Sequence, residues 1–263
     1  MHSNCLVVLS NRKYSDLWRI IIENYKSYDF FRDNFDLFIT TDSIDEFKDV
    51  CEQTDFRFLI YPTNISWLGG LKFIVAKYLV KKYRYVLFTF DDLFITKVEV
   101  QGIKGILEKK FNYYKLLNTH INIYNFSGCT SNELNLRKIN DSYIGSLVFS
   151  IFQTDFFDKM ISQMPDNLNP WEYEFNVCNY FTEKDDSYGV QCSLIHYQNL
   201  VIKGKVDPIA KRVIEFSLGN KLQLSREEMR FWDVVRYYTK YFLWHSFRAA
   251  VPFSVHKLFR QKY

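Results

Sequence analysis

The chain has 263 residues, 48% of them hydrophobic, and a formal net charge of +4. This length fits one large domain, or one domain with an extension, and the low Gly and Pro counts argue against long disordered segments. The charge is uneven, because residues 226–263 contain eight Arg and Lys but only three Asp and Glu, which leaves the rest close to neutral. This distribution argues against a nucleic-acid binder.

The five cysteines, Cys5, Cys51, Cys129, Cys178 and Cys192, are odd in number, widely spaced and form no CxxC pair. They indicate neither a disulfide framework nor a zinc site, so we expect reduced cysteines. The N-terminus lacks the basic-then-apolar order of a signal peptide, and no apolar stretch approaches the roughly 18 residues that span a bilayer. We therefore expect a cytoplasmic protein.

The first sixty residues alternate between strand and helix. Apolar runs at 5–9, 36–41 and 56–61 predict buried strands. Apolar residues at helical spacing predict a helix over 14–27, and the acidic stretch 42–52 predicts a short one. This alternation is the signature of a parallel α/β sheet.

The next strand, 85–90, follows a loop over 64–70 and a predicted helix over 71–83, and it runs directly into Asp91 and Asp92. Burying unpaired carboxylates is costly, so a hydrophobic core does not explain this pair. In an open α/β sheet, ligands bind at the C-terminal ends of the strands. The pair therefore predicts a ligand site, although a turn or a helix N-cap would also favour Asp.

The remaining elements complete a mixed sheet with a helical C-terminal end. We expect a domain boundary near residue 215, which separates a catalytic domain, 1–215, from a basic, aromatic helical extension, 216–263. The fold class predicted is α/β, a Rossmann-type mixed sheet flanked by helices. The pattern predicts helices over 97–118, 154–163, 209–218 and 225–249, a helix that opens at Trp171, and strands at 121–126, 146–152 and 189–194.

Two further groups of polar residues are candidates for chemistry. Glu172 and Glu174 fit the first turn of a helix, or one of them could act as a general base beside Trp171. Lys203 and Lys205 flank a glycine after His196, and they fit either a solvated loop or a phosphate clamp with His196 as a metal ligand or phosphate donor.

These motifs together resemble the small bacterial glycosyltransferases of surface-polysaccharide and lipopolysaccharide clusters. The resemblance rests on Phe-Asp-Asp-Leu-Phe at 90–94, Pro-Trp-Glu-Tyr-Glu at 170–174 and Lys-Gly-Lys at 203–205, and it covers about residues 5–208. That family tends to carry an Asp-Asp-Phe-Phe motif after a strand and a Trp-Glu-Phe-Glu motif. The resemblance implies a GT-A type fold that binds a nucleoside-diphosphate sugar.

The resemblance also implies roles for single residues. Asp91 and Asp92 would take the part of the Asp-x-Asp motif, which holds Mn²⁺ or Mg²⁺ against the donor diphosphate, although here the acids are adjacent. His196 would be a further metal ligand, and Lys203 and Lys205 would meet the diphosphate. Trp67, in a Trp-Leu-Gly-Gly stretch, and Ser10, in the polar turn after the first strand, are expected to bind the donor. The residues expected to be catalytic are therefore Glu174, Glu172 and Asp92.

The implied reaction moves a sugar from the donor to a glycan or lipid-linked acceptor, with Glu174 or Glu172 taking the acceptor proton if configuration inverts. Residues 226–263 could contact the cytoplasmic face of an inner membrane, or pack on the catalytic domain with a solvated basic face. Two other functions fit the residues: a non-catalytic nucleotide- or glycan-binding scaffold, and a nucleotidyl or phosphoryl transferase.

Overall fold

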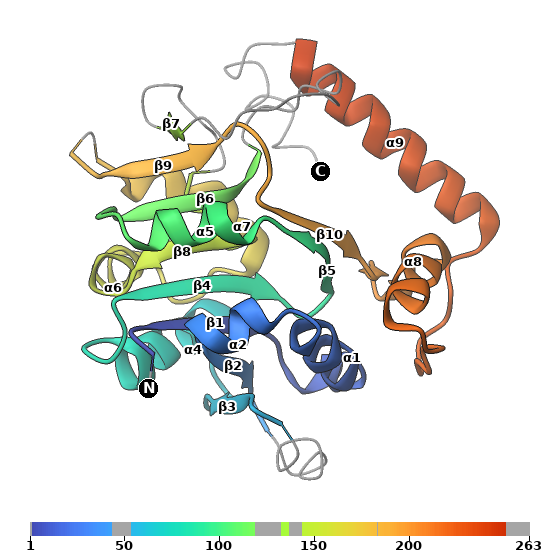
Figure 1. Cartoon of the computed structure of the whole chain (residues 1–263), viewed down its shortest axis with the longest axis horizontal. Coiled ribbons are helices and arrows are strands. Elements are labelled where there is room, and N and C mark those ends of the chain that lie inside the picture. The colour runs from blue at the N-terminus through green and yellow to red at the C-terminus, as the bar shows by residue number, and fades with distance from the viewer. Residues whose placement is uncertain (1, 44–53, 119–132, 137–143, 183, 251–263) are drawn as a thin grey trace.

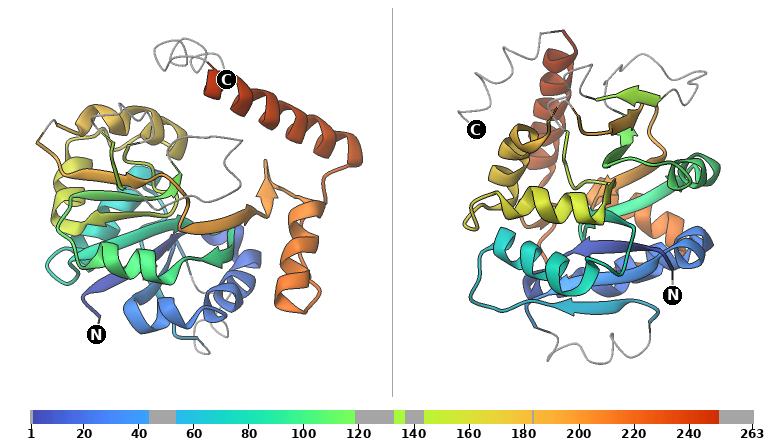
Figure 2. Two further views of the ribbon diagram at one scale, coloured as in Figure 1. Left: turned by 45° about the horizontal axis from the view of Figure 1, so that its top comes forward. Right: turned by 90° about the vertical axis from the view of Figure 1, so that its left-hand side faces the viewer.

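A computed structural model describes residues 2–43, 54–118, 133–136, 144–182 and 184–250. Its centre is an eight-stranded mixed sheet that helices cover on both faces (Figures 1 and 2). The strands are β1 (Asn4–Leu9), β2 (Asp36–Thr41), β3 (Arg57–Ile60), β4 (Tyr85–Phe90), β6 (Tyr113–Asn118), β7 (Glu133–Asn135), β8 (Ser150–Gln153) and β9 (Ser187–Val190).

The strand order is β3-β2-β1-β4-β8-β6-β9-β7. Strands β3, β2, β1 and β4 are parallel to one another, whereas β8 runs antiparallel to both β4 and β6. The chain adds β2 and β3 on one side of β1 and then returns to place β4 on the other side. This change of direction creates a crevice at the C-terminal ends of β1 and β4, where such sheets bind ligands.

Two hydrophobic cores pack on the two faces of this sheet. One lies under α1 (Ser15–Lys26), α2 (Asp29–Asn34) and α5 (Val100–Leu107), and the other under α4 (Trp67–Ile74), α6 (Thr154–Ser162) and α7 (Pro170–Asn176) (Figure 2). β4 contributes Leu87 to the first core and Phe88 to the second. A strand buried on both faces explains why its sequence is continuously apolar instead of alternating.

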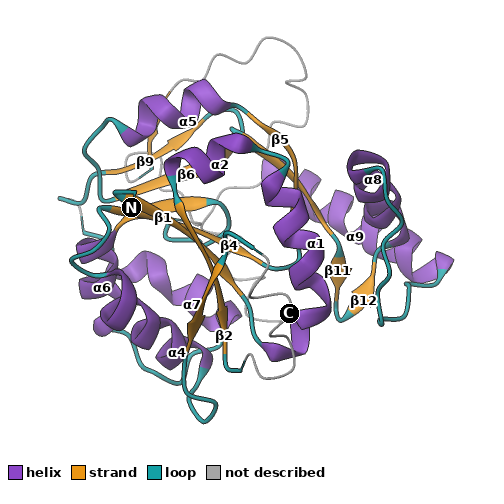
Figure 3. Ribbon diagram, turned by 60° about the horizontal axis from the view of Figure 1, so that its bottom comes forward, coloured by secondary structure: helices purple, strands orange, loops and turns teal. Residues whose placement is uncertain are grey.

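A second layer of structure extends from the C-terminal end of β4. β5 (Leu93–Val98) leaves the main sheet and pairs antiparallel with β10 (Ile195–Asn199). The hairpin β11 (Val201–Ile202)–β12 (Lys205–Val206) follows, then α8 (Pro208–Leu218) and α9 (Phe231–Ala250) (Figure 3). The fold thus confirms the mixed α/β sheet with a helical C-terminal extension.

Three sequence predictions were wrong. The single helix over 97–118 is the short α5 followed by β6. Tyr113 and Tyr114 pack into opposite cores, as successive residues of a strand do, and such aromatic residues favour strands. The loop over 64–70 ends at Ser66, whose side chain caps α4. The C-terminal helix begins at Phe231, not at 225. The predicted helix 42–52 and strand 121–126 lie largely or wholly outside the described residues.

The cysteines also depart from expectation, since Cys192 is disulfide-bonded whereas Cys5 and Cys178 are free. The predicted domain boundary at residue 215 lies inside α8, beside Ile214, which is buried in the first core. Among the described residues, no helix is long and apolar enough to cross a membrane.

α9 stands away from the sheet, as Figure 1 shows. Val234 is buried, and the Tyr238 hydroxyl donates a 2.5 Å hydrogen bond to the Asp207 carboxylate. Phe231 and Trp232, in contrast, are 70% and 76% exposed. The membrane contact expected of residues 226–263 stays a prediction, and these exposed aromatic side chains are the part of α9 that such a contact would cover.

Candidate functional site

A pocket of about 360 Å³ lies at the C-terminal ends of β1 and β4. Five of the residues predicted from the sequence line it, namely Ser10, Trp67, Asp91, Asp92 and Glu174. These residues come from four separate parts of the chain, so the fold gathers them. The remaining lining residues are Leu9, Asn11, Tyr14, Phe90, Leu93, Leu147, Val148, Pro170, Trp171, Tyr173 and Asn199.

Asp91 and Asp92 form the two-residue connection between β4 and β5. The Asp91 amide donates to the Leu9 carbonyl at 3.3 Å, and the Leu200 amide donates to the Asp92 carbonyl at 2.8 Å. The end of β1 and the residue that follows Asn199 therefore hold the connection from two sides. Asp91 and Asp92 do form a turn, which was the alternative to a ligand site, but both residues also line the pocket.

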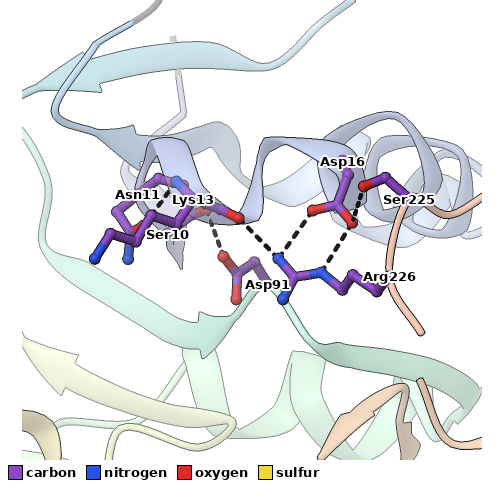
Figure 4. Close-up of polar contacts among 7 residues, drawn as sticks. All are labelled: Ser10, Asn11, Lys13, Asp16, Asp91, Ser225 and Arg226. Carbon is purple, nitrogen blue, oxygen red and sulfur yellow. Dashed lines mark hydrogen bonds and ion pairs between the residues drawn. The ribbon is translucent and has the colours of Figure 1, made fainter. Parts of the chain in front are cut away.

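Asp91 is fixed by a chain of hydrogen bonds from the end of β1. The Ser10 hydroxyl donates to Asp91 Oδ2 at 2.5 Å (Figure 4). Trp18 Nε1 donates to Ser10 Oγ at 2.8 Å. The Ser10 amide in turn donates to Thr40 Oγ1 at 2.9 Å. The main contact of the Ser10 side chain is thus with Asp91. This hydrogen bond explains why a small polar residue follows the buried strand β1.

The two carboxylates share a poorly solvated space. Burial, and next the charge of Asp92, raise the pKa of Asp91 well above its usual value. Burial likewise raises the pKa of Asp92 to about 6. The Arg226 guanidinium opposes both increases. Asp92 is therefore mainly ionised at neutral pH, but its surroundings make ionisation less favourable than in water, as is common at functional sites.

Asp92→Asn is expected to stabilise the fold, and increasingly so as the pH rises from about 4 to about 7. The unfolded chain releases this proton near pH 3.8, whereas the folded chain keeps it to about pH 6. The raised pKa therefore destabilises the native state above that window and has no effect below it, with an upper limit of about 3 kcal/mol. Urea unfolding of both proteins at pH 4 and 7.5, in EDTA, measures the difference. A gain that is equal at both pH values would contradict the assignment.

Glu174 enters the pocket from α7. The Ser146 hydroxyl donates to Glu174 Oε1 at 3.0 Å, and this bond leaves the second carboxylate oxygen free of that contact. The neighbouring Tyr173 is buried, donates to the Gly145 carbonyl at 3.0 Å and packs edge-on against Trp67 with ring centroids 5.7 Å apart. These contacts hold the first turn of α7 against the pocket wall.

Glu172 lies on the same helix, but its carboxylate caps the helix N-terminus. Its carboxylate accepts a 2.9 Å hydrogen bond from the Asn169 amide, and the Asn169 side chain caps the helix in return. This reciprocal capping box explains the choice of Glu at the third position of α7. Glu172 is exposed and does not line the pocket, so the geometry separates the two glutamates.

His196, Lys203 and Lys205 do not line the pocket. His196, for which the sequence left a solvated loop or a metal-ligand role open, lies on β10, exposed and opposite Lys97. Lys203 and Gly204 form the two-residue turn of the β11–β12 hairpin, both with positive φ (51° and 80°), and Lys205 pairs with Glu227 at 3.3 Å. Gly204 is therefore explained by the turn, because such hairpins require a left-handed backbone.

The structure adds three residues that sequence reasoning missed. Tyr14 and Asn199 line the pocket, and Arg226, in the segment between α8 and α9, packs on the Tyr14 ring. No local pattern marks them in the sequence. Only the charge excess of the C-terminal region pointed toward Arg226.

The donor atoms at the acid pair fit a hard divalent cation. Asp91 and Asp92 supply carboxylates, and Asn199 Oδ1 is buried without a hydrogen-bond partner among the described residues. Mg²⁺ and Mn²⁺ prefer such oxygen ligands and commonly take one or two carboxylates together with substrate phosphates. The described part of the chain contains no group of three or more His, Cys, Asp or Glu side chains placed to hold a metal ion together.

No family model matches this chain, and no curated protein matches it. Solved structures of S. aureus TarS residues 1–349 do match. The structure of TarS 1–349 alone matches with a TM-score of 0.54 and 15% sequence identity, and the match covers 87% of this chain and 67% of TarS 1–349. The complex with UDP-GlcNAc matches with a TM-score of 0.55 and 16% identity, covering 87% of this chain and 68% of the other. The complex with UDP gives 0.53 at 16% over 86% and 67%. At this identity the likeness shows the fold, which is GT-A-like as predicted.

Proposed function

We propose that the chain is a glycosyltransferase that moves a sugar from a nucleoside-diphosphate sugar to a glycan or lipid-linked acceptor of a bacterial surface polysaccharide. The observation that carries this proposal is the pocket at the strand-order reversal, where Asp91, Asp92 and Glu174 meet. The likeness of the fold to TarS, which was solved with UDP-GlcNAc and with UDP, supports a nucleotide-sugar donor.

The acid pair would hold Mn²⁺ or Mg²⁺ against the donor diphosphate. When bound, such an ion neutralises the negative charge that develops on the leaving diphosphate. Asp92 is the better placed of the two acids for this role, because one carboxylate oxygen of Asp91 already accepts the Ser10 hydrogen bond. Ser10 would then act by orienting Asp91, and the Trp67 and Tyr14 rings in the pocket wall would face the donor.

Glu174 would act on the acceptor. In an inverting reaction the acceptor hydroxyl attacks the anomeric carbon as the bond to the diphosphate breaks, and a carboxylate takes the hydroxyl proton. The Ser146 hydrogen bond fixes the orientation of the Glu174 carboxylate, which is what a general base needs. Glu172 cannot serve equally, since its carboxylate caps α7 outside the pocket.

A panel of nucleoside-diphosphate sugars, each with and without Mn²⁺, tests the proposal by thermal unfolding. We expect one base to raise the melting temperature, and Mn²⁺ to increase the shift. Ligand at about 100 times its dissociation constant stabilises a folded protein by about 2.7 kcal/mol, which is a shift of several degrees for a domain of this size. Slow release of the nucleoside diphosphate from that donor should accompany binding.

Each other function predicts a different result. A scaffold would bind a nucleotide sugar or glycan but release no nucleoside diphosphate, even with an acceptor extract present. A nucleotidyl transferase would release pyrophosphate from a nucleoside triphosphate and a sugar phosphate. The absence of any shift with every donor would overturn the proposed function.

A further inference from the structure

The segment 225–229, which we call the strap, is part of the connection between α8 and α9, and its Arg226 packs on the pocket residue Tyr14. On one side it joins the β11–β12 hairpin, because Val206 donates to the Glu227 carbonyl and Met229 donates to the Val206 carbonyl, both at 2.9 Å. On the other side it reaches the start of α1 through Arg226. The strap therefore bridges two parts of the fold that are far apart in sequence.

Arg226 is held in one orientation. Its Nε donates to Asp16 Oδ2 at 2.8 Å, and its Nη2 donates to Asp16 Oδ1 at 2.9 Å and to the Lys13 carbonyl at 2.8 Å (Figure 4). The guanidinium also lies 4.5 Å from the centroid of the Tyr14 ring, and its side chain is only 14% exposed. A planar guanidinium with one edge fixed this way presents its other edge in a set direction.

The edge that remains is Nη1, which has no partner among the described residues. Figure 4 shows the guanidinium beside Asp91, and its charge acts on Asp91 and Asp92 alike. Tyr14, on which it stacks, is part of the pocket wall. The Nε and Nη2 contacts are enough to join the strap to α1, so a purely structural role does not account for Nη1.

An anion that enters this pocket meets two carboxylates and therefore needs positive charge nearby. Lys203 lies in the hairpin turn and Lys205 pairs with Glu227 of the strap. Arg226 does not itself line the pocket, but it stacks on Tyr14, which does. The hairpin that carries these lysines supports the strap that carries Arg226. The cationic role predicted for Lys203 and Lys205 is thus better filled by a residue further along the chain.

We propose that Arg226 is a donor-binding residue, whose free Nη1 edge contacts the diphosphate of the nucleotide sugar while Asp16 and Tyr14 hold it in place. This inference rests on the proposed function and names a residue that neither the motifs nor the resemblance includes. A guanidinium suits the task because it makes directed hydrogen bonds to phosphate oxygens.

The test compares Arg226→Gln with wild type in binding two probes, the nucleoside diphosphate of the best donor and its parent nucleoside. We expect the diphosphate to bind at least tenfold more weakly to the variant, by calorimetry with Mn²⁺, and the nucleoside to bind unchanged, by ligand-observed NMR. Arg226→Lys keeps the charge but loses the fork, so it should recover only part of the affinity. Arg230→Gln, which removes an exposed charge outside the strap, is the matched control and should bind both probes normally.

The outcomes separate the two proposals. If wild type binds no nucleoside diphosphate, the proposed function fails. If wild type binds it and Arg226→Gln binds it equally well, only the role of Arg226 fails. Equal losses for diphosphate and nucleoside would also overturn that role, because they would mean that Arg226 merely shapes the pocket. Should Arg226→Gln not fold, Arg226→Lys and Asp16→Asn, compared by the same two probes, decide the question.

Discussion

Asp92→Asn is expected to reduce kcat/KM for sugar transfer at least a hundredfold while the fold remains intact. The asparagine keeps the size of the side chain but loses the charge that would hold the metal and diphosphate. Removing one group that stabilises charge in a transition state typically costs a factor of about 10²–10³ in rate. Initial rates over a range of donor concentrations, at saturating Mn²⁺, measure the change.

The matched control for this variant is Asp33→Asn. Asp33 is an exposed acid at the end of α2, so its loss removes the same charge far from the pocket wall and should leave kcat/KM unchanged. Circular dichroism and the unfolding curve at pH 7.5 report on the fold. An Asp92→Asn protein that is folded and retains more than a tenth of wild-type activity would remove Asp92 from the proposed site.

Glu174→Gln and Glu172→Gln form a second pair with opposite expected results. We expect Glu174→Gln to lower kcat by about 10²–10⁴, the usual contribution of a general base, and to leave donor affinity close to that of wild type. Glu172→Gln should keep its activity and weaken the helix cap by at most about 1 kcal/mol, since Gln can replace Glu in a capping box. Steady-state kinetics and calorimetric titration with the donor measure both effects.

This pair discriminates because the two residues are two positions apart on one short helix and undergo the same chemical change. A general disturbance of α7 would affect both variants, whereas loss of a catalytic base affects only one. If Glu172→Gln were the inactive protein, the capping role of Glu172 would be insufficient and the base would have to be reassigned. If both were fully active, general-base catalysis from α7 would be excluded.

Much of the fold was predictable because β4 and its parallel neighbours carry their signal locally. Residues 85–90 are apolar throughout, as a strand buried on both faces must be, and the acids directly after them mark the ligand end of the sheet. Trp67, Glu174 and Ser10 also fall in the pocket. Each of these follows a local signal, namely a strand end, a helix start or a short motif.

The rest depends on contacts between distant residues. His196 follows a predicted strand and has the chemistry of a metal ligand, but pairing of β10 with β5 leaves it exposed beside Lys97. Lys203-Gly204-Lys205 resembles a phosphate loop because hairpin turns and phosphate loops both need glycine. Glu172 and Glu174 are indistinguishable by composition, and only the Asn169 and Ser146 hydrogen bonds tell them apart.

The strap has a further consequence for the order in which the protein is made. Arg226 contacts Asp16 across 210 positions of sequence, whereas Ser10 and Asp91 are separated by only 81. On the ribosome, β1, β4 and both acids therefore emerge long before the residue that compensates their charge. A nascent chain that has not yet reached residue 226 presents two poorly solvated carboxylates without their neighbouring cation. Translation through residue 226 thus completes the electrostatics of a pocket whose walls were encoded far upstream.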